Sequence, residues 1–215
     1  MGVEWELQLL DAKTYDLTDQ IIPLLEIVAD PLHINPEFIQ NTVEIVSSPC
    51  ESIHELEAHV GEVFARLRSG CEQLGLHLCG AGTHPFSERL ALLTPLPRYL
   101  ALETSMGILS HTQITFGTHA HIGMRSGEEA IAVMNHLIPY IPMLVALSAN
   151  SPFWRGYETG HASYRQRILA GARSYDLPPP FASWQEFERF IEGTIRTGIY
   201  AGINDIHWDI RPRPH

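Results

Sequence analysis

The sequence predicts an α+β protein, with a curved, mainly antiparallel sheet and helices packed on one face. Stretches such as residues 3–9 alternate apolar and polar side chains, which is the period of a strand with one buried face. Other stretches begin with a serine followed three residues later by a glutamate, which is typical of a helix N-terminus. These strands and helices do not alternate regularly, so a parallel βαβ arrangement is disfavoured. The length of 215 residues and the hydrophobic content of 45% suit a single domain over residues 1–215.

The expected strands cover residues 3–9, 43–45, 76–79, 114–123 and 206–211. In the first strand, Trp5 and Leu7 point to one face while Glu4 and Glu6 point to the other, because successive side chains of a strand alternate. Polar positions of the later alternating strands are occupied by His119, His121, His207, Asp209 and Arg211. The sheet is therefore expected to have one apolar face and one face rich in ionisable groups.

Capping boxes predict three helices, which begin after Ser52, Ser126 and Ser183. The first carries apolar residues at steps of three and four and is expected to end at Gly75. The second runs towards Ala149, and Pro139 and Pro142 must bend or break it. Two further helices are expected at residues 18–29 and 99–110.

The ionisable face is the main functional signal. If the strands share one sheet, the residues that converge there are Glu4, Glu6, Glu44, His119, His121, His207, Asp209 and Arg211. An ordinary solvated sheet face is the alternative, since such faces are also polar. However, these positions hold carboxylates and imidazoles without lysine between them, and paired carboxylates repel unless a cation lies between them. This composition favours a site for Mg²⁺ or Mn²⁺.

Charge and cysteine usage exclude several classes of protein. The 14 basic and 25 acidic residues give a net charge of −11, which disfavours binding to nucleic acid or to an anionic membrane. The three cysteines form no CxxC pair and are expected to be reduced thiols. The longest apolar run, 137–147, is too short to cross a bilayer and contains two prolines, and no signal peptide is recognised. We therefore expect a cytoplasmic protein with no nucleic-acid or membrane partner.

Candidate anion-binding groups occur in a glycine-rich turn and at several arginines. The turn covers residues 80–86 and includes His84, and its backbone N–H groups could bind an anion, although a turn that only needs positive φ has the same pattern. The candidate arginines are Arg98, Arg155, Arg165 and Arg211, each of which taken alone could equally be a surface residue. Neither a Walker A loop nor a Gly-x-Gly-x-x-Gly turn after a strand is present, so a nucleotide site would be of another design.

A set of short motifs resembles one known family. The motifs occur in this order: Gly2-Val3-Glu4-Trp5-Glu6-Leu7, Val43-Glu44-Ile45, Gly82-Thr83-His84-Pro85-Phe86, Arg98-Tyr99, Gly117-Thr118-His119-Ala120-His121-Ile122-Gly123, Leu147-Ser148-Ala149-Asn150-Ser151-Pro152-Phe153 and His207-Trp208-Asp209-Ile210-Arg211-Pro212. The set resembles the bacterial carboxylate–amine ligases, the YbdK-like type 2 relatives of glutamate–cysteine ligase. The resemblance extends over essentially the whole chain.

The resemblance implies a glutamine-synthetase-like fold and a ligase that uses ATP and Mg²⁺ (or Mn²⁺). The small-molecule substrates that the resemblance implies are glutamate and an amine, which is cysteine in the usual reaction of the family. The implied metal ligands are Glu4, Glu6, Glu44 and His119, with Glu37 at a position that is usually acidic. Arg165 and Arg211 are implied as catalytic residues, and the implied cofactor-binding residues are Arg98, Arg165, Arg211 and His84.

The chain also departs from the family pattern. Members of the family continue into a strand of the type Thr-x-Glu-x-Arg, which supplies another metal-binding glutamate, whereas this sequence stops at His215 just before it. The chain is therefore expected to be the N-terminal portion of a longer family domain, with weak or no activity by itself. Glu158 stands where relatives commonly have aspartate.

Two other functions remain open at this point. A metal-dependent hydrolase could use His119 and His121 with the neighbouring acids, and it would bind zinc tightly without using ATP. A non-catalytic truncated relative could instead persist as a folded subunit, since an unpaired sheet edge favours association, including homo-oligomers.

Overall fold

The computed structural model describes residues 1–171 and 175–213. The chain divides into two compact units, and each is described by itself. Unit 1 comprises Met1–Ile122 and Ala149–Ile168, and unit 2 comprises Gly123–Ser148 and Leu169–His215. The single domain over residues 1–215 stays a prediction.

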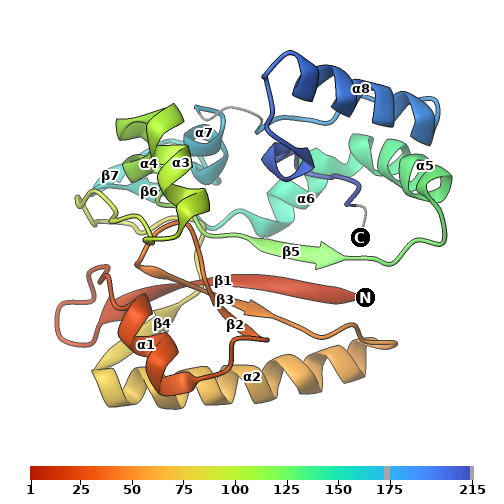
Figure 1. Cartoon of the computed structure of the whole chain (residues 1–215). Helices are drawn as coiled ribbons and strands as arrows, with labels where there is room; N and C mark the ends of the chain where they lie inside the picture. The colour runs from red at the N-terminus through yellow and green to blue at the C-terminus, as the bar shows by residue number, and fades with distance from the viewer. Residues whose placement is uncertain (172–174, 214–215) are drawn as a thin grey trace. The chain divides into compact units, whose positions relative to one another are not determined.

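A five-stranded sheet lies at the centre of unit 1 (Figure 1). Its strands are β1 (Gly2–Asp11), β2 (Ile34–Pro36), β3 (Thr42–Val46), β4 (Leu76–Cys79) and β5 (Thr118–His121). β1 pairs with β3 along one edge and with both β4 and β5 along the other, while β2 pairs with the far edge of β3. All of these pairings are antiparallel, which confirms the predicted α+β class with an antiparallel sheet.

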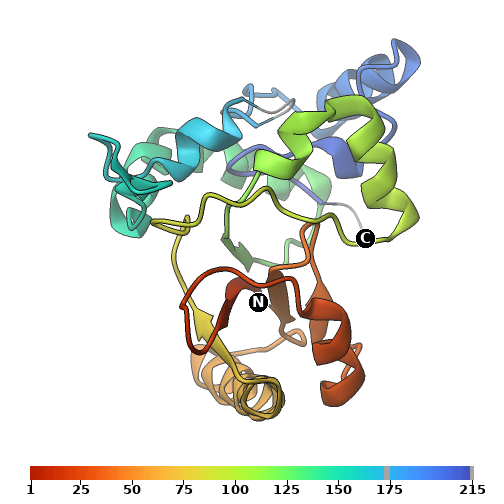
Figure 2. The same cartoon turned by 90° about the vertical axis from the view of Figure 1, so that its left-hand side faces the viewer.

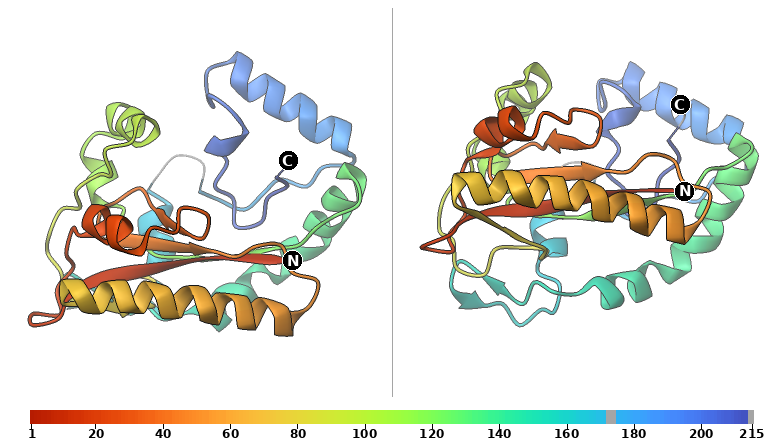
Figure 3. Two further views of the ribbon diagram at one scale, coloured as in Figure 1. Left: turned by 60° about the horizontal axis from the view of Figure 1, so that its bottom comes forward. Right: turned by 90° about the horizontal axis from the view of Figure 1, so that it is seen from below.

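Helices α1 (Ile21–Val28) and α2 (Ile53–Leu74) cover one face of this sheet (Figures 2 and 3). The odd-numbered side chains of β1 pack against them, as the alternation predicted: Leu7 and Leu9 are buried with Ile45 of β3 and Leu67 of α2. The even-numbered side chains of β1 therefore project from the other face of the sheet, away from both helices.

The ends of α2 follow the sequence signals. The Ser52 hydroxyl accepts a hydrogen bond from the backbone N–H of Glu55, and Gly75 ends the helix with a φ of 64°. Gly70 allows α1 to approach closely, because a Cβ at this position would lie 2.5 Å from Cγ2 of Val28. The helix therefore fixes both the position of α1 and the start of β4.

The remaining elements of unit 1 follow β4 in the chain, and Trp154 in one of them packs against a second, smaller core of this unit. These elements are α3 (Pro97–Met106), α4 (Ile108–Thr112), β6 (Phe153–Trp154), β7 (Tyr157–Glu158) and α7 (Arg165–Leu169). The single helix expected at 99–110 is in fact divided, because Gly107 has a φ of 55°, which an α-helix does not accommodate. The strand expected at 114–123 shortens to β5, yet Ile114 and Phe116 are buried in this core as the alternation predicted.

Unit 2 is mainly helical. Its helices are α5 (Gly127–Leu137), the 3₁₀ helix η1 (Ile138–Tyr140), α6 (Ile141–Ser148), α8 (Trp184–Arg196) and the 3₁₀ helix η2 (Ile203–Asp205). Ser126 and Ser183 cap α5 and α8 as predicted. The expected break falls at Pro139, which lies in η1 between α5 and α6. Phe181 and Phe187 form the buried core of this unit with Trp208.

One helical stretch of the described residues has the length and composition to cross a membrane. It covers residues 127–148 and has a hydropathy of 1.7. The apolar run at residues 137–147, expected to be too short to cross a bilayer, therefore lies within a longer helical stretch, and a single stretch of this kind does not identify a membrane protein.

The prediction of a strand at residues 206–211 is wrong. These residues follow η2 without forming a strand, although Ile206 and Trp208 are buried in the core of unit 2. The alternation therefore predicts correctly which side chains face the core. It does not predict whether another strand lies alongside to complete the hydrogen bonds of a sheet.

Candidate metal centre

The open face of the sheet in unit 1 carries the predicted acidic residues. β1 contributes Glu4 and Glu6, because the intervening Trp5 faces the helices. Glu6 lies opposite Glu44 of β3, and Glu4 lies opposite His119 of β5. Residues directly opposite one another in an antiparallel pair share a face, so the register itself brings these side chains together.

The side chains form two overlapping groups of three. Atoms of Glu4, Glu44 and His119 lie within 4.8 Å of one another, and so do oxygens of Glu6, Glu37 and Glu44. Ligands of one Mg²⁺ ion each lie about 2.1 Å from it, so a small rearrangement suffices for either group to surround an ion. Glu44 belongs to both groups. The predicted convergence of Glu4, Glu6, Glu44 and His119 is therefore present in the geometry.

Glu4 is held in its charged form. His119 Nδ1 lies 2.9 Å from one carboxylate oxygen of Glu4, and His121 Nε2 lies 3.2 Å from the other. The hydrogen bond from His119 is the main cause that lowers the pKa of Glu4 to about 2, and the charge of His121 adds to it against the effect of burial. Glu4 is thus an anion over the whole neutral pH range.

Glu44 and Glu37 have the opposite behaviour. Burial, followed by the charges of Glu37, Glu4 and Glu6, raises the pKa of Glu44 to about 9. Burial and the charge of Glu6 raise the pKa of Glu37 to about 7, although its carboxylate accepts a 2.8 Å hydrogen bond from the N–H of Phe38. Carboxylates packed so closely hold protons unless a cation compensates their charge. This donor set therefore fits a divalent cation with oxygen ligands.

Arg98 lies beside this acidic group. Its charge opposes the rise in the pKa of both Glu37 and Glu44. The guanidinium stacks on the ring of Tyr99, 4.4 Å from the ring centroid, and donates a 2.6 Å hydrogen bond to the Tyr99 hydroxyl. Arg98 is thus placed next to the predicted metal ligands, and its binding of a cofactor stays a prediction.

Arg165 lies against the same face, above a glycine. A Cβ at Gly117 would lie 2.7 Å from Nη2 of Arg165 and 3.5 Å from Oε2 of Glu6, so both side chains meet over this position. The Glu6 carboxylate accepts a 2.5 Å hydrogen bond from the N–H of Gly117. The Nε of Arg165 is buried and has no hydrogen-bond partner among the described residues. A guanidinium with an unused buried donor fits the predicted role in binding an anion.

His84 has a structural position. It is buried, its Nδ1 accepts a 2.9 Å hydrogen bond from the N–H of Ser87, and its Nε2 lies 3.0 Å from the carbonyl oxygen of Tyr15. Both ring nitrogens are therefore used within the protein, and the ring stabilises the glycine-rich turn. Binding of a cofactor by His84 stays a prediction.

Arg211 belongs to unit 2, together with His207 and Asp209. The guanidinium of Arg211 donates a hydrogen bond to the carbonyl oxygen of Ile206, and the ring of His207 stacks on Tyr175. That these residues join the acidic face, and that Arg211 takes part in catalysis or binds the cofactor, stay predictions.

Two residues near the site were given no role from the sequence, although Gln8 lies on the polar face of the first strand and Asn150 lies in one of the quoted motifs. Gln8 is fully buried, and its Nε2 donates to the carbonyl oxygens of Ala81 and Thr83, which ties β1 to the glycine-rich turn. Asn150 accepts a 2.8 Å hydrogen bond from the N–H of Gly82 through Oδ1. The position of Gln8 on the polar face of β1 could have indicated that it lies near the site. No local pattern in the sequence predicts the contact between Asn150 and Gly82.

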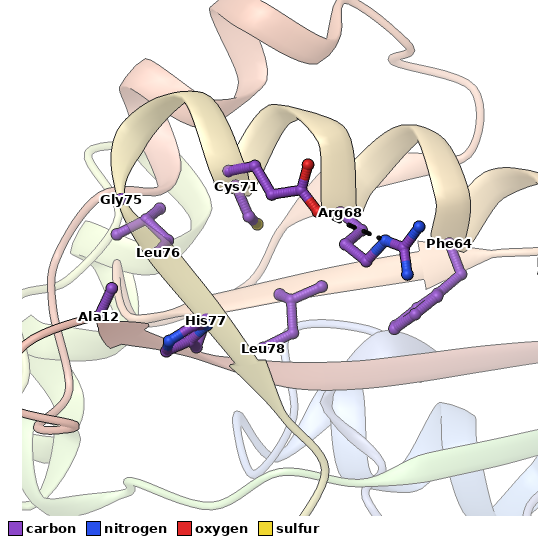
Figure 4. Close-up of a pocket in the computed structure, with 9 residues that line it drawn as sticks. Ala12, Phe64, Arg68, Cys71, Gly75, Leu76, His77 and Leu78 are labelled. Atoms are coloured by element: carbon purple, nitrogen blue, oxygen red, sulfur yellow. Dashed lines mark ion pairs between the residues drawn. The ribbon is translucent and has the colours of Figure 1, made fainter.

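A groove on the other side of the sheet does not share this chemistry. It has a volume of about 410 Å³ and lies between α2 and β4 (Figure 4). Phe64, Cys71 and Leu78 line it, with Arg68 and Glu72 paired 3.7 Å apart above them. Burial raises the pKa of the Cys71 thiol to about 12, so this thiol is uncharged at neutral pH. The acidic face therefore remains the candidate site.

Replacing His119 with alanine tests the electrostatics of the site. The change is expected to raise the pKa of Glu4 from about 2 towards the ordinary value of 4.5, because the main hydrogen bond to its carboxylate is lost. Titration of the Glu4 side-chain carboxyl by NMR measures the shift. His54→Ala, at an exposed position of α2, is the control and is expected to leave Glu4 unchanged. An unshifted Glu4 in H119A would contradict the contact.

Comparison with known proteins identifies the family of this chain. The sequence profile of the family described as Glutamate-cysteine ligase family 2 (GCS2) matches residues 1–215. A relative from Trichormus variabilis, named "Putative glutamate--cysteine ligase 2", is 45% identical over 214 residues, which are 100% of this chain and 55% of that protein. A relative of the same name from Mycobacterium tuberculosis is 37% identical over 216 residues, with 100% of this chain and 57% of that protein covered. The chain thus spans just over half the length of these relatives.

The fold has a solved counterpart. The crystal structure of a bifunctional glutathione synthetase from Pasteurella multocida superposes with a TM-score of 0.64 and 13% identity, over 99% of this chain and 32% of that one. At this identity the match supports the fold alone. The profile match over the whole chain and the two relatives establish that the chain belongs to glutamate–cysteine ligase family 2.

Proposed function

We propose that this chain forms the metal-binding part of an ATP- and Mg²⁺-dependent carboxylate–amine ligase, which joins a carboxyl group of glutamate to an amine such as that of cysteine. Membership of the family supports the ligase class. The observation that carries the proposal is the pair of overlapping acidic groups that share Glu44. Two carboxylates with raised pKa values on one sheet face are best explained by a site built for cations.

The proposed reaction has two steps. A carboxylate oxygen of glutamate attacks the γ-phosphorus of ATP and ADP leaves, which gives an acyl phosphate. The amine nitrogen then attacks the acyl carbon, inorganic phosphate leaves, and the amine proton is released. Both steps accumulate negative charge on phosphoryl oxygens, so catalysis depends mainly on positioning and on compensating charge.

Different residues of this chain would bind the metal ions and the phosphoryl oxygens. One metal ion would be held by Glu4, Glu44 and His119, and a second by Glu6, Glu37 and Glu44. Bound Mg²⁺ supplies positive charge to the phosphoryl oxygens. Arg165 lies beside Glu6, its Nε–H has no partner in the part of the chain that the structure describes, and its guanidinium would bind an anionic oxygen of ATP or of the acyl phosphate.

Metal and nucleotide binding test the proposal. Titration with Mn²⁺, followed by electron paramagnetic resonance, is expected to show bound metal that Mg²⁺ displaces. ATP is expected to bind more tightly in the presence of Mg²⁺, and ADP release is measured in parallel with glutamate and cysteine. Tight zinc with no effect of ATP would overturn the ligase assignment in favour of the metal-dependent hydrolase. The geometry does not favour that alternative, because each three-residue group contains at most one histidine.

The cellular setting forms part of the same proposal. We assign the chain to the cytoplasm, since Cys50, Cys71 and Cys79 are all free thiols. The net charge of −11 supports small-molecule substrates rather than a nucleic-acid or membrane partner. Homo-oligomer formation also remains a proposal, which the mass of the chain in solution would test.

A further inference from the structure

Two neighbouring residues, Asn150 and Ser151, connect separate parts of the candidate site. They precede β6 in the segment that returns to unit 1. The Oδ1 of Asn150 accepts the N–H of Gly82 at 2.8 Å, and the Oγ of Ser151 accepts the N–H of Arg165 at 3.2 Å. Adjacent side chains therefore hold the glycine-rich turn and the beginning of α7, which are more than 80 residues apart in the sequence.

The contact around Gly82 is close on three sides. A Cβ at Gly82 would lie 3.0 Å from Oδ1 of Asn150, 3.2 Å from Oγ of Ser151 and 3.2 Å from Cδ of Arg165. No larger residue fits without displacing these atoms. The glycine thus allows the aliphatic part of Arg165 to lie directly on the turn, which fixes where its guanidinium begins.

Further bonds stiffen the same connection from both ends. Ser151 is buried, its N–H donates to the carbonyl oxygen of Ala162, and its carbonyl oxygen accepts from the N–H of Tyr164. On the other side, the carbonyl oxygen of Gly82 accepts the N–H of Phe116 at 3.1 Å. Phe116 directly precedes Gly117, over which Arg165 meets Glu6. The turn, the approach to β5 and the start of α7 are therefore linked through a few short bonds.

We propose that Asn150 and Ser151 are positioning residues for Arg165. They clamp its backbone and the stem of its side chain against Gly82, so that the guanidinium is directed over Gly117 beside the acidic face. The buried Nε of Arg165, which has no hydrogen-bond partner within residues 1–171 and 175–213, identifies this guanidinium as the group that Asn150 and Ser151 position, because a buried donor without a partner is costly unless a ligand completes it. This inference rests on the proposed function, in which Arg165 binds a phosphoryl oxygen.

The test is a double-mutant cycle on ATP binding, measured by calorimetry with Mg²⁺ present. Arg165→Ala is expected to weaken ATP binding about ten- to a hundredfold, the usual range for a hydrogen bond to a charged group. Ser151→Ala and Asn150→Ala are each expected to weaken it several-fold. In the R165A background, S151A is expected to have no further effect, because Ser151 acts only through Arg165.

Conservative variants separate positioning from a general loss of structure. Asn150→Asp keeps the acceptor oxygen for the N–H of Gly82 and is expected to bind ATP more tightly than N150A. Ser69→Ala makes the serine-to-alanine change at an exposed position of α2 and is expected to leave ATP affinity unchanged. Asn150 is itself exposed, so N150A is expected to fold even where substitution of the buried Ser151 destabilises the chain.

The possible outcomes distinguish the two proposals. If R165A leaves ATP affinity unchanged, the role of Arg165 in the proposed function fails, and the positioning role fails with it. If R165A weakens binding while S151A and N150A have no effect, or their effects add fully to that of R165A, only the positioning role is overturned. Mn²⁺ affinity, measured for each variant, should not fall, since none of these residues belongs to the acidic groups and the loss of the Arg165 charge beside Glu6 can only favour a cation; a fall would show collapse of the site and overturn the positioning role.

Discussion

Replacement of Glu44 by glutamine is expected to lower the Mn²⁺ affinity of the chain by about a hundredfold, since the cation displaces the Glu44 proton and a carboxylate beside it contributes a few kcal/mol more than a neutral amide oxygen at effective protein dielectric values. Glu44 belongs to both groups of possible ligands, so the variant should weaken every ion held there. Electron paramagnetic resonance of Mn²⁺ measures the effect. Glu57→Gln, the same change at an exposed position of α2, is the matched control.

The same variant is expected to change the pH dependence of stability. The folded chain keeps a proton on Glu44 up to a pKa of about 9, whereas the unfolded chain loses it near 4.5. Between these values the folded state binds more protons, so the free energy of unfolding falls as pH rises, by up to about 1.4 kcal/mol per pH unit for one proton. Glu37, with a pKa of about 7, adds to this fall at lower pH.

Glutamine at position 44 cannot release a proton, so E44Q should flatten the fall in stability between pH 7 and 9. Without metal it should be more stable than the parent chain at pH 8, although it binds metal less tightly. Urea unfolding at several pH values, with metal removed by chelation, measures both curves. Parallel curves for the two chains, or an unchanged Mn²⁺ affinity, would show that Glu44 is an ordinary surface carboxylate.

Replacement of Leu9 by alanine is expected to cost about 2–5 kcal/mol of unfolding free energy, the range for large-to-small substitution in a core. Leu9 is 0% exposed and lies on the central strand β1, where its side chain packs with the residues beneath α1 and α2. Urea unfolding measures the loss. Leu32→Ala removes the same atoms at a position that is 78% exposed and should change stability by less than about 0.5 kcal/mol. Equal effects of the two variants would contradict the packing.

The local part of this structure was predictable from the sequence. The capping boxes place the starts of α2, α5 and α8, because the serine side chain and its backbone partner lie within one turn. The alternation in β1 predicts which side chains face the core and which face the candidate site, because the period of two is a local property of the strand. Once the strands are paired, the side chains on the face opposite the core include Glu4, Glu44 and His119, which form one group.

What the sequence could not supply was the pairing itself. Residues 206–211 alternate as clearly as β1, but no strand lies beside them in the described chain, because pairing depends on a partner distant in sequence. The division of the expected helix at Gly107 into α3 and α4 could not be predicted either, because a glycine inside an apolar helical pattern is compatible with one continuous helix or with two. The contact of Asn150 with Gly82 likewise depends on tertiary structure alone.

The alternation along β1 has a consequence for how this segment can change. Insertion or deletion of one residue between Glu6 and Leu7 would rotate one part of the strand by half a period relative to the other. With Leu7 and Leu9 kept in the core, the carboxylates of Glu4 and Glu6 would then turn towards the helices, and the Trp5 side chain would replace them on the opposite face of the sheet. Folding and chemistry would be lost in one event, so viable length changes here are confined to even numbers of residues or to the loops that flank the strand.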